Sequence, residues 1–539
     1  MQENISNTPH KSFFEESGGK RGIFKWIFST DHKRIGLLYM YSIISFFIVG
    51  VILGLLMRLE LMEPGQQFMK PATYNSLFTL HGVIMIFLFI IPGIPAVFGN
   101  IMLPILIGAK DVAFPKVNLL SWWLYVIGAL FALSTLVFGN GPADTGWTFY
   151  APYSVNTETN VSLSVLAAFI LGFSSILTGL NFIVTIHRMR APGMTWFKMP
   201  LFSWSLYATA WIQLLATPVI GITLLMIFAE RLLGVGLFDP SLGGDPILYQ
   251  HMFWIYSHPA VYVMVLPAMG VISEVISTFS QRKIYGYKAI AYSSLAIAFI
   301  GYFVWGHHMF TSGMSGPARV IFSILTFLVA IPSAVKVFNW LATLYGGSIS
   351  VKAPLLYALG FIFLFMIGGL TGLILGALAT DVHLHDTVFV VGHFHYVMFG
   401  GTGFAFMAAM HYWFPKIYGI QYNMKRANLS FWVLFIGFNI LYFPMMVVGV
   451  MGMPRRYFDY LPEFHIPNLI STIGSWILAI GLIMMIANLV SAFRKREKAT
   501  INPWDGLTLE WQISSPPSLE NFDEIPTITK GPYEYHEQK

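Results

Sequence analysis

The sequence has no cysteine, and only 10% of its 539 residues are charged. Without cysteine, the chain cannot form disulfides, thiolate metal sites or iron–sulfur clusters of its own. With so little charge, it cannot cover the surface of a soluble protein of this size. Hydrophobic residues make up 56% of the chain, and the mean hydropathy is positive. The composition therefore indicates a polytopic membrane protein.

Apolar runs of about 20 residues, the length that crosses a bilayer, recur along the chain. We expect transmembrane helices at 35–57, 78–107, 119–138, 163–187, 205–228, 250–277, 288–310, 318–340, 354–377, 387–412, 429–450 and 468–491. No Ser/Gly-rich linker or charged low-complexity tract divides these runs. The sequence therefore predicts an all-α fold, a membrane bundle of about twelve transmembrane helices that occupies residues 35–491.

The loops on the two sides of this bundle differ in basic residues. One side has the basic N-terminal segment and clusters at 110–116, 188–190, 282–283, 425–426 and 494–496, whereas the loop 139–162 has no Lys or Arg. By the positive-inside rule, residues 1–34 and 492–539 are cytoplasmic tails. The first 30 residues also lack the apolar core of a signal peptide. The net charge of +6 thus reflects topology and does not indicate binding to nucleic acid.

Arg455 and Arg456 are an exception to this charge pattern, because they form a basic pair on the predicted outer side. A basic pair there calls for a local anionic partner, which the propionates of a haem would supply.

Histidines inside the apolar runs are the most informative residues of the chain, because ionisable side chains at membrane depth are costly and usually functional. Six of them are the candidate metal ligands: His81, His258, His307, His308, His393 and His395. His393 and His395 occupy positions i and i+2, which point about 200° apart on an α-helix. One helix thus presents a histidine to each of two sites. A single intramembrane histidine is usually a hydrogen-bonded core residue, but this pattern predicts two metallocofactors and a third metal nearby.

His258 and Tyr262 are four residues apart and share a helix face. His307 and His308 are adjacent, and three neutral imidazoles around one ion suit copper or zinc.

With these motifs, the chain resembles subunit I of the haem–copper oxidases, specifically cytochrome c oxidase. The resemblance runs from STDHK at 29–33 to SSPP at 514–517, which is nearly the whole chain. It implies two haems of the A type and one copper, CuB. The implied ligands are His81 and His395 for the low-spin haem, His393 for the high-spin haem, and His258, His307 and His308 for the copper.

The resemblance also assigns roles to residues around the cofactors. Tyr262 resembles the tyrosine that is covalently linked to His258 and gives an electron and a proton during O–O cleavage. Arg58 resembles the arginine that hydrogen-bonds the formyl group of haem A; the alternative is a snorkelling interfacial arginine. Three residues resemble the propionate-binding set: Trp147, Arg455 and Arg456.

Two further metal sites are implied at the outer end. His385 and Asp386 resemble a magnesium site at the interface with subunit II, although Asp386 could instead be a helix N-cap. Glu60 and Gly65 resemble an outer calcium or sodium site.

Lys336 lies inside an apolar span, where a charge usually marks a proton or ion path. With Thr326, Ser333 and Ser273 it resembles the K-channel of the family, which ends at Tyr262. A snorkelling lysine is the alternative.

Asp111, with Asn100 and Asn118, resembles the mouth of the D-channel, although Asp111 alone could be an ordinary surface acid. The chain departs from the common pattern further along this path, because many relatives have a glutamate where it has Ala260. In a subclass of the family, hydroxyls replace that carboxyl; here they belong to Tyr256 and Ser257. Hydroxyls can relay protons through water, but neither stays ionised near neutral pH.

The resemblance implies a proton-pumping terminal oxidase that oxidises ferrocytochrome c and reduces dioxygen to water. It implies a bacterial inner membrane, a subunit II with a dinuclear copper centre, a subunit III and other oxidase subunits, while membership of a respiratory supercomplex stays open. A quinol oxidase is the alternative, because the donor depends on subunit II. Nitric oxide reductase lacks the counterparts of Tyr262 and Lys336, and a secondary transporter would not need the six histidines.

Overall fold

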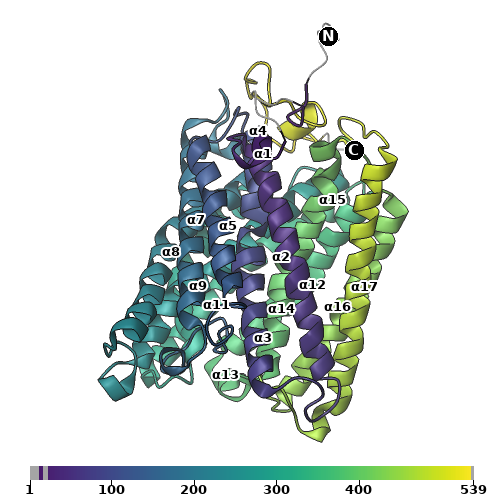
Figure 1. The fold of residues 1–539 in the computed structure, drawn as a ribbon. Coiled ribbons are helices and arrows are strands. Elements are labelled where there is room, and N and C mark those ends of the chain that lie inside the picture. Colours follow the sequence, from purple (N-terminus) through teal and green to yellow (C-terminus); the bar gives the residue numbers. More distant parts are fainter. Residues whose placement is uncertain (1–10, 16–21, 536–539) are drawn as a thin grey trace.

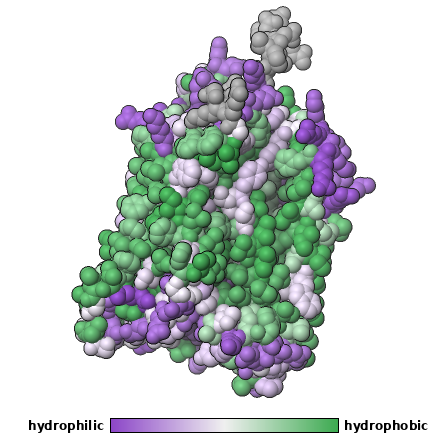
Figure 2. All heavy atoms as spheres, viewed as in Figure 1, coloured by the Kyte–Doolittle hydropathy of each residue, from purple (hydrophilic) through white to green (hydrophobic). Residues whose placement is uncertain are grey.

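The structure, a computed structural model, describes residues 11–15 and 22–535. Helices that run side by side form one bundle, and both ends of the described chain lie at the same end of it (Figure 1). In the described part of the chain, 12 helical spans are long and apolar enough to cross a membrane. Hydrophobic side chains form a broad belt between two more polar ends (Figure 2). The predicted all-α membrane bundle is confirmed.

The spans begin and end near the predicted bounds, most of them extended by several residues. In chain order they are α2 (His32–Glu60), α3 to α4 (Pro71–Leu106), α5 (Pro115–Ser134), α7 (Val161–Arg188), α8 (Leu201–Leu233), α9 (Pro246–Ser280), α10 with two 3-10 turns (Tyr287–Met309), α11 (Gly316–Leu344), α12 (Ala353–Gly376), α14 to α15 (Val388–Tyr418), α16 (Met424–Val450) and α17 with one 3-10 turn (Pro462–Lys495). The short helix α1 (Phe24–Ile27) precedes the first span, and α6 (Tyr153–Asn156) and α13 (Leu378–Leu384) lie between spans.

Besides the 3-10 turn that precedes α17, three spans depart from regular α-helix. The helix α10 ends at Ile300, and 3-10 turns at Gly301–Phe303 and Trp305–Met309 follow it. Wide π-helical turns separate α3 (Pro71–Val83) from α4 (Asn100–Leu106), and another at Met398–Gly403 separates α14 (Val388–Val397) from α15 (Phe404–Tyr418). Such departures often occur at functional sites, because they re-aim the side chains beside them.

Side-chain caps fix where several helices start. The Asp31 carboxylate accepts from Arg34 N at 2.9 Å at the start of α2, and the Thr387 hydroxyl accepts from Phe389 N at 3.3 Å at the start of α14. These oxygens satisfy backbone N–H groups that have no partner within the helix. The cap at Thr387 marks the start of α14, which carries His393 and His395.

The span α9 is central to the bundle. In its apolar window 89% of residues are buried, against 22% in α2. Helices α8, α10, α11, α12 and α15 all contact it. A helix enclosed on all sides offers its polar side chains to the protein interior, and those of α9 include His258 and Tyr262.

Candidate functional site

A cavity of about 720 Å³ lies inside the bundle, walled mainly by α2, α3, α9, α11, α12, α14 and α16. It gathers residues from distant parts of the sequence. All six predicted ligands line it: His81, His258, His307, His308, His393 and His395. Of the other predicted residues, the lining includes Arg58, Trp147, Tyr262, Thr326, Ser333, His385, Asp386, Arg455 and Arg456. The cavity is therefore the place where the predicted cofactor sites meet.

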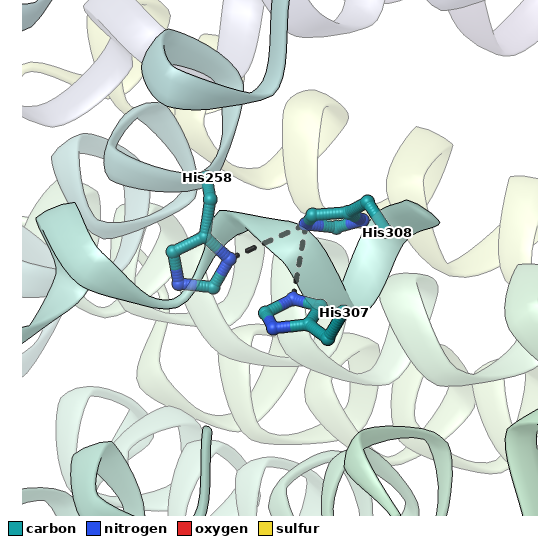
Figure 3. Close-up of side chains that lie close together, drawn as sticks. All are labelled: His258, His307 and His308. Carbon is teal, nitrogen blue, oxygen red and sulfur yellow. Dashed lines mark hydrogen bonds between the residues drawn. The ribbon is translucent and has the colours of Figure 1, made fainter. Parts of the chain in front are cut away.

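His258, His307 and His308 converge on one point of this cavity (Figure 3). Nε2 of His308 lies 3.3 Å from Nδ1 of His258 and 3.1 Å from Nε2 of His307. Nitrogens that bind one tetrahedral ion at about 2 Å are about 3.3 Å apart. Among the described residues, this is the one group of three metal-binding side chains whose ligand atoms lie within 4.8 Å of one another. The three rings can hold one copper-sized ion.

Two neighbours hold these rings in place. The ring of Trp254 stacks on His308, with centroids 3.7 Å apart and an interplanar angle of 7°. The hydroxyl of Thr326 lies 2.9 Å from Nδ1 of His307, which leaves Nε2 of that ring for an ion. Thr326 was predicted to be on a proton path. Trp254 was missed, because a tryptophan in an apolar helix reads as a core residue.

Tyr262 lies beside His258 on the same face of α9, as their spacing predicts. Their ring centroids are 4.8 Å apart at an angle of 65°. Nε2 of His258 is buried and has no hydrogen-bond partner among the described residues. A buried ring nitrogen without a partner is costly. The unpartnered Nε2 of His258 is consistent with a bond at this nitrogen other than a hydrogen bond.

The other three histidines share one arrangement. Nδ1 of each ring lies within hydrogen-bond distance of a backbone carbonyl: Gly50 O at 2.8 Å for His81, Gly368 O at 3.0 Å for His393 and Val391 O at 2.9 Å for His395. When Nδ1 donates to a carbonyl, the lone pair of Nε2 is left to bind a metal. These are the tautomers that haem ligands need.

His393 and His395 do face opposite sides of α14. His393 contacts α12 through Gly368, whereas the ring of His395 stacks on Tyr442 of α16 with centroids 4.2 Å apart. Glycines leave room beside the haem-ligand candidates. A Cβ at Gly54 would lie 3.2 Å from the ring of His81, and one at Gly372 would lie 3.0 Å from that of His393.

Known proteins resemble the chain over almost its whole length. The family model of cytochrome c and quinol oxidase polypeptide I matches residues 34–477. The chain is 44% identical over 517 residues to cytochrome c oxidase subunit 1 of Thermostichus vulcanus, covering 95% of this chain and 93% of that one. It is 46% identical over 509 residues to cytochrome c oxidase subunit 1 of a Synechocystis strain, covering 94% and 92%.

The chain belongs to this oxidase family. A haem–copper terminal oxidase dimer solved by cryo-EM has a similar fold, with a TM-score of 0.70 at 22% identity over 85% of this chain and 84% of that chain. The protein is therefore the catalytic subunit of a haem–copper terminal oxidase, an oxidoreductase embedded in the membrane. Its family implies haem and copper as cofactors, and the cavity has the side chains to bind them. Membership excludes the transporter alternative.

At the outer end of the oxidase cavity, Arg455 forms an ion pair with Asp386, with Nη2 and Oδ1 2.6 Å apart. Burial would raise the pKa of Asp386, but Arg455, His385 and Arg456 together hold the pKa below its ordinary value. Asp386 is thus one anionic partner that the basic pair required. Burial, and then Arg455, lowers the pKa of Arg456 to about 10. Arg456 lines the cavity beside Thr148, whose hydroxyl lies 3.5 Å away.

The magnesium candidates His385 and Asp386 are neighbours of a second carboxylate. Nδ1 of His385 lies 3.0 Å from Oδ2 of Asp381, which the sequence analysis missed. The alternative that Asp386 is an N-cap is wrong, because Thr387 caps α14 and Asp386 has a φ of 55°.

Arg58 and Glu60 lie at the end of α2. Nη2 of Arg58 donates to Asn468 O at 2.7 Å, and Nε is buried without a partner among the described residues, so the side chain does not snorkel to the surface. The carboxylate of Glu60 accepts three backbone N–H groups from residues 67–69 at 2.9–3.0 Å. Gly65 N donates to Asp459 at 2.6 Å, a carboxylate that the sequence analysis missed.

Lys336 is buried, and its Nζ donates to Ser294 Oγ at 2.7 Å and to Ile290 O at 3.1 Å. The snorkelling alternative is therefore wrong. Ser294, on α10, was missed because its partner is more than forty positions away in the sequence. Ser333 lines the cavity, whereas Ser273 accepts from Trp340 Nε1 at 2.9 Å.

Asp111 is half-buried in the loop between α4 and α5. Burial first, and then the Asp31 carboxylate, raises the pKa of Asp111 to about 7. The main-chain oxygen of Asn100 lies 2.7 Å from Nδ1 of His32. Both side-chain polar atoms of Asn118 are buried without a partner among the described residues, as a side chain that binds water would be.

A polar series that the sequence analysis missed continues from Asn118. The hydroxyl of Ser121 donates to Asn118 O at 2.7 Å, and the Tyr39 hydroxyl lies 3.0 Å from both Ser121 Oγ and Ser174 Oγ. Ser257 on α9 is buried, and its hydroxyl has no partner among the described residues; Tyr256 beside it is also buried.

Proposed function

We propose that this oxidase takes electrons from ferrocytochrome c, reduces dioxygen to water at a high-spin haem and copper, and pumps protons outward. The convergence of all six predicted ligands on one cavity is the observation that supports it most strongly. Oxygen uptake by the purified complex with reduced cytochrome c, and separately with a quinol, tests the donor. Activity with the quinol alone would favour the quinol oxidase alternative.

In this proposal His81 and His395 hold a low-spin haem, and His393 holds a high-spin haem on the opposite face of α14. Two axial histidines leave no open iron position and suit electron transfer, whereas one histidine leaves a position for dioxygen. His258, His307 and His308 would hold copper. The haems and copper supply the redox chemistry, and the backbone carbonyls that bond Nδ1 fix the orientation of the haem-binding rings.

Tyr262 is proposed to supply a proton and an electron in bond cleavage, and to be covalently linked to His258. The unpartnered Nε2 of His258 and the 4.8 Å separation of the two rings support this link. The phenol stands within the cavity, so its proton can reach a bound substrate.

Residues at the cavity ends are proposed to select the haem type and the outer ions. Arg58 would bind the formyl group of haem A, and its unpartnered Nε is available for that bond. Trp147 and Arg456, with Arg455, would bind propionates. His385 and Asp386 would hold magnesium together with Asp381, and Glu60 and Gly65 would form a calcium site with Asp459.

Two proton routes are proposed. One runs from Lys336 past Ser294 and Thr326 to Tyr262, with Ser333 and Ser273 in its walls. The other starts at Asp111, passes Asn100, Asn118 and the hydroxyl series at Tyr39, and reaches Tyr256 and Ser257, which stand in for the glutamate absent at Ala260. Buried hydroxyls and amides without protein partners support bound water along this second route.

The proposed setting is a bacterial inner membrane with both ends of the chain in the cytoplasm. Both ends lie on one side of the bundle, which fits the charge pattern of the loops (Figure 1). The proposed partners are a subunit II with a dinuclear copper centre, a subunit III and other oxidase subunits. Residues 1–34 and 492–539 are proposed to be cytoplasmic.

A further inference from the structure

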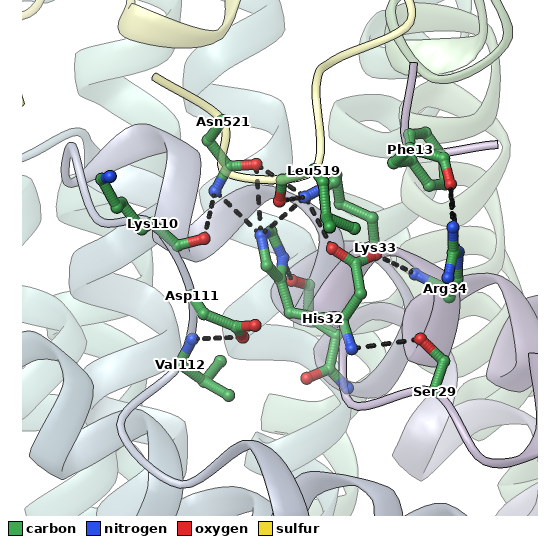
Figure 4. A network of polar contacts seen from close by, with 12 residues as sticks. Phe13, Ser29, His32, Lys33, Arg34, Lys110, Asp111, Val112, Leu519 and Asn521 are labelled. Carbon is green, nitrogen blue, oxygen red and sulfur yellow. Dashed lines mark hydrogen bonds and ion pairs between the residues drawn. The ribbon is translucent and has the colours of Figure 1, made fainter. Parts of the chain in front are cut away.

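Residues near the C-terminus lie against the loop that carries Asp111 (Figure 4). The amide Nδ2 of Asn521 donates to the carbonyls of Ala109 and Lys110, both at 3.0 Å. Its Oδ1 accepts from Lys33 Nζ at 2.8 Å. One side chain thus ties the loop 109–111 to the start of α2.

The side chains of Asn521 and Lys33 are buried, and their polar atoms make several contacts. Asn521 exposes 3% of its surface and Lys33 none. Nζ of Lys33 also pairs with Asp31 at 2.9 Å, and Nδ2 of Asn521 lies 2.9 Å from Nε2 of His32. Because each group bonds several others, moving Asn521 would leave buried polar atoms without partners.

The backbone at Asn521 selects the same residue type. Its φ is +64°, in the left-handed region that asparagine and glycine tolerate and most residues do not. Glycine would fit this backbone conformation but has no side-chain amide to make these hydrogen bonds. Asparagine is the residue that satisfies both the conformation and the four contacts of its side chain.

The surroundings of Asp111 make its protonation sensitive to the position of this loop. Asp31, the N–H of His32 and Lys33 face it from α2. Lys110 belongs to its own loop and forms an ion pair with Glu520 of the C-terminal segment. Burial and Asp31 favour the protonated carboxyl, whereas Lys33 favours the charged form. Displacement of the loop changes both the burial of the carboxyl and its distance from these charges.

We propose that Asn521 is a positioning residue for proton uptake: it fixes the loop 109–111 so that the Asp111 carboxyl stands at the mouth of the polar series that continues through Asn118. This inference rests on the proposed role of Asp111 in the second proton route. The segment that carries Glu520 and Asn521 thereby becomes part of the proton entrance.

The test uses the complete oxidase and two variants that both keep the positive φ. Asn521→Gly removes the amide, and Asn521→Asp keeps the shape but adds a carboxylate. Turnover with saturating donor, the KM for the donor, haem content and proton uptake would be measured across the pH range. Asp505→Gly is the matched control, because Asp505 has a φ of 56° in the same segment and an exposed side chain.

We expect Asn521→Gly to lower turnover about tenfold, because a misplaced proton-transfer group loses part of its rate advantage. The midpoint of its turnover–pH profile should move to lower pH, since a released loop exposes Asp111 to water. Asn521→Asp should move the midpoint the other way, since added negative charge favours the protonated carboxyl. The KM for the donor, the haem content and the Asp505→Gly control should match wild type.

Asp111→Asn separates this inference from the proposed function. Wild-type turnover and pumping in Asp111→Asn would overturn the second proton route itself. Impaired Asp111→Asn together with wild-type turnover and pH midpoint in both Asn521 variants would overturn the positioning role alone. Loss of turnover that is equal at every pH and proportional to lost haem would mark Asn521 as structural, and would also overturn it.

Discussion

Tyr262 is proposed to matter for the reaction more than for the stability of the fold. Its ring lies against His258 in the cavity. We expect Tyr262→Phe to change the free energy of unfolding by less than about 1 kcal/mol, to keep both haems and nearly to abolish oxygen uptake. Mass spectrometry should also find a linked His258–Tyr262 peptide in wild type alone. Oxygen uptake near the wild-type rate would show that the phenol is not needed.

Lys336 is also proposed to act in the reaction. Its Nζ is buried and donates only to uncharged oxygens on α10. We expect Lys336→Met to slow reduction of the high-spin haem and copper more than that of the low-spin haem. Methionine has a similar length and opens no large cavity, so the missing group is the one that carries the proton. Anaerobic stopped-flow reduction would measure both rates. If reduction of both haems were slowed equally, Lys336 would have a structural role and no role in proton transfer.

At the scale of elements, α14 separates two iron sites by its helical geometry. We expect His395→Ala, like His81→Ala, to remove the low-spin haem and leave part of the high-spin haem, because His393 faces the opposite side of α14. His307→Ala should instead remove copper and leave both haem bands. Reduced-minus-oxidised spectra, carbon monoxide binding and metal analysis would distinguish these outcomes. If His395→Ala lost only the carbon monoxide-binding signal, the ligand assignments would have to be exchanged.

The sequence allowed the regular parts of these elements to be predicted. The helical period places His393 and His395 on opposite faces, and it places His258 and Tyr262 on one face. The 3-10 turn that carries His307 and His308, and the π-turns after Ile84 and Met398, were not predicted, because hydropathy does not distinguish them from α-helix. Contacts between distant segments, such as Lys336 with Ser294, depend on packing and have no local signal.

At the scale of the whole molecule, the proposed second proton route would use hydroxyls and amides between Asp111 and α9 in place of a carboxyl. We expect Tyr256→Phe combined with Ser257→Ala to reduce proton ejection per electron more than the sum of the two single changes, because either hydroxyl alone can partly hold a shared water chain. Reconstituted vesicles with a pH-sensitive dye would report ejection beside turnover. A double variant that pumps and turns over like wild type would show that protons bypass this segment.

The C-terminal segment also has a consequence for how the protein is made. Asn521 contacts His32 across 489 positions of the chain, and Tyr533 donates to Glu274 across 259. A ribosome adds about 5–20 residues per second, so α2 waits roughly half a minute or longer in the membrane before its last partner is synthesised. The last long helix of the bundle, α17, ends at Lys495, before Asn521 in the chain. The contacts of Asn521 with the start of α2 can therefore form only after all the membrane spans have been synthesised.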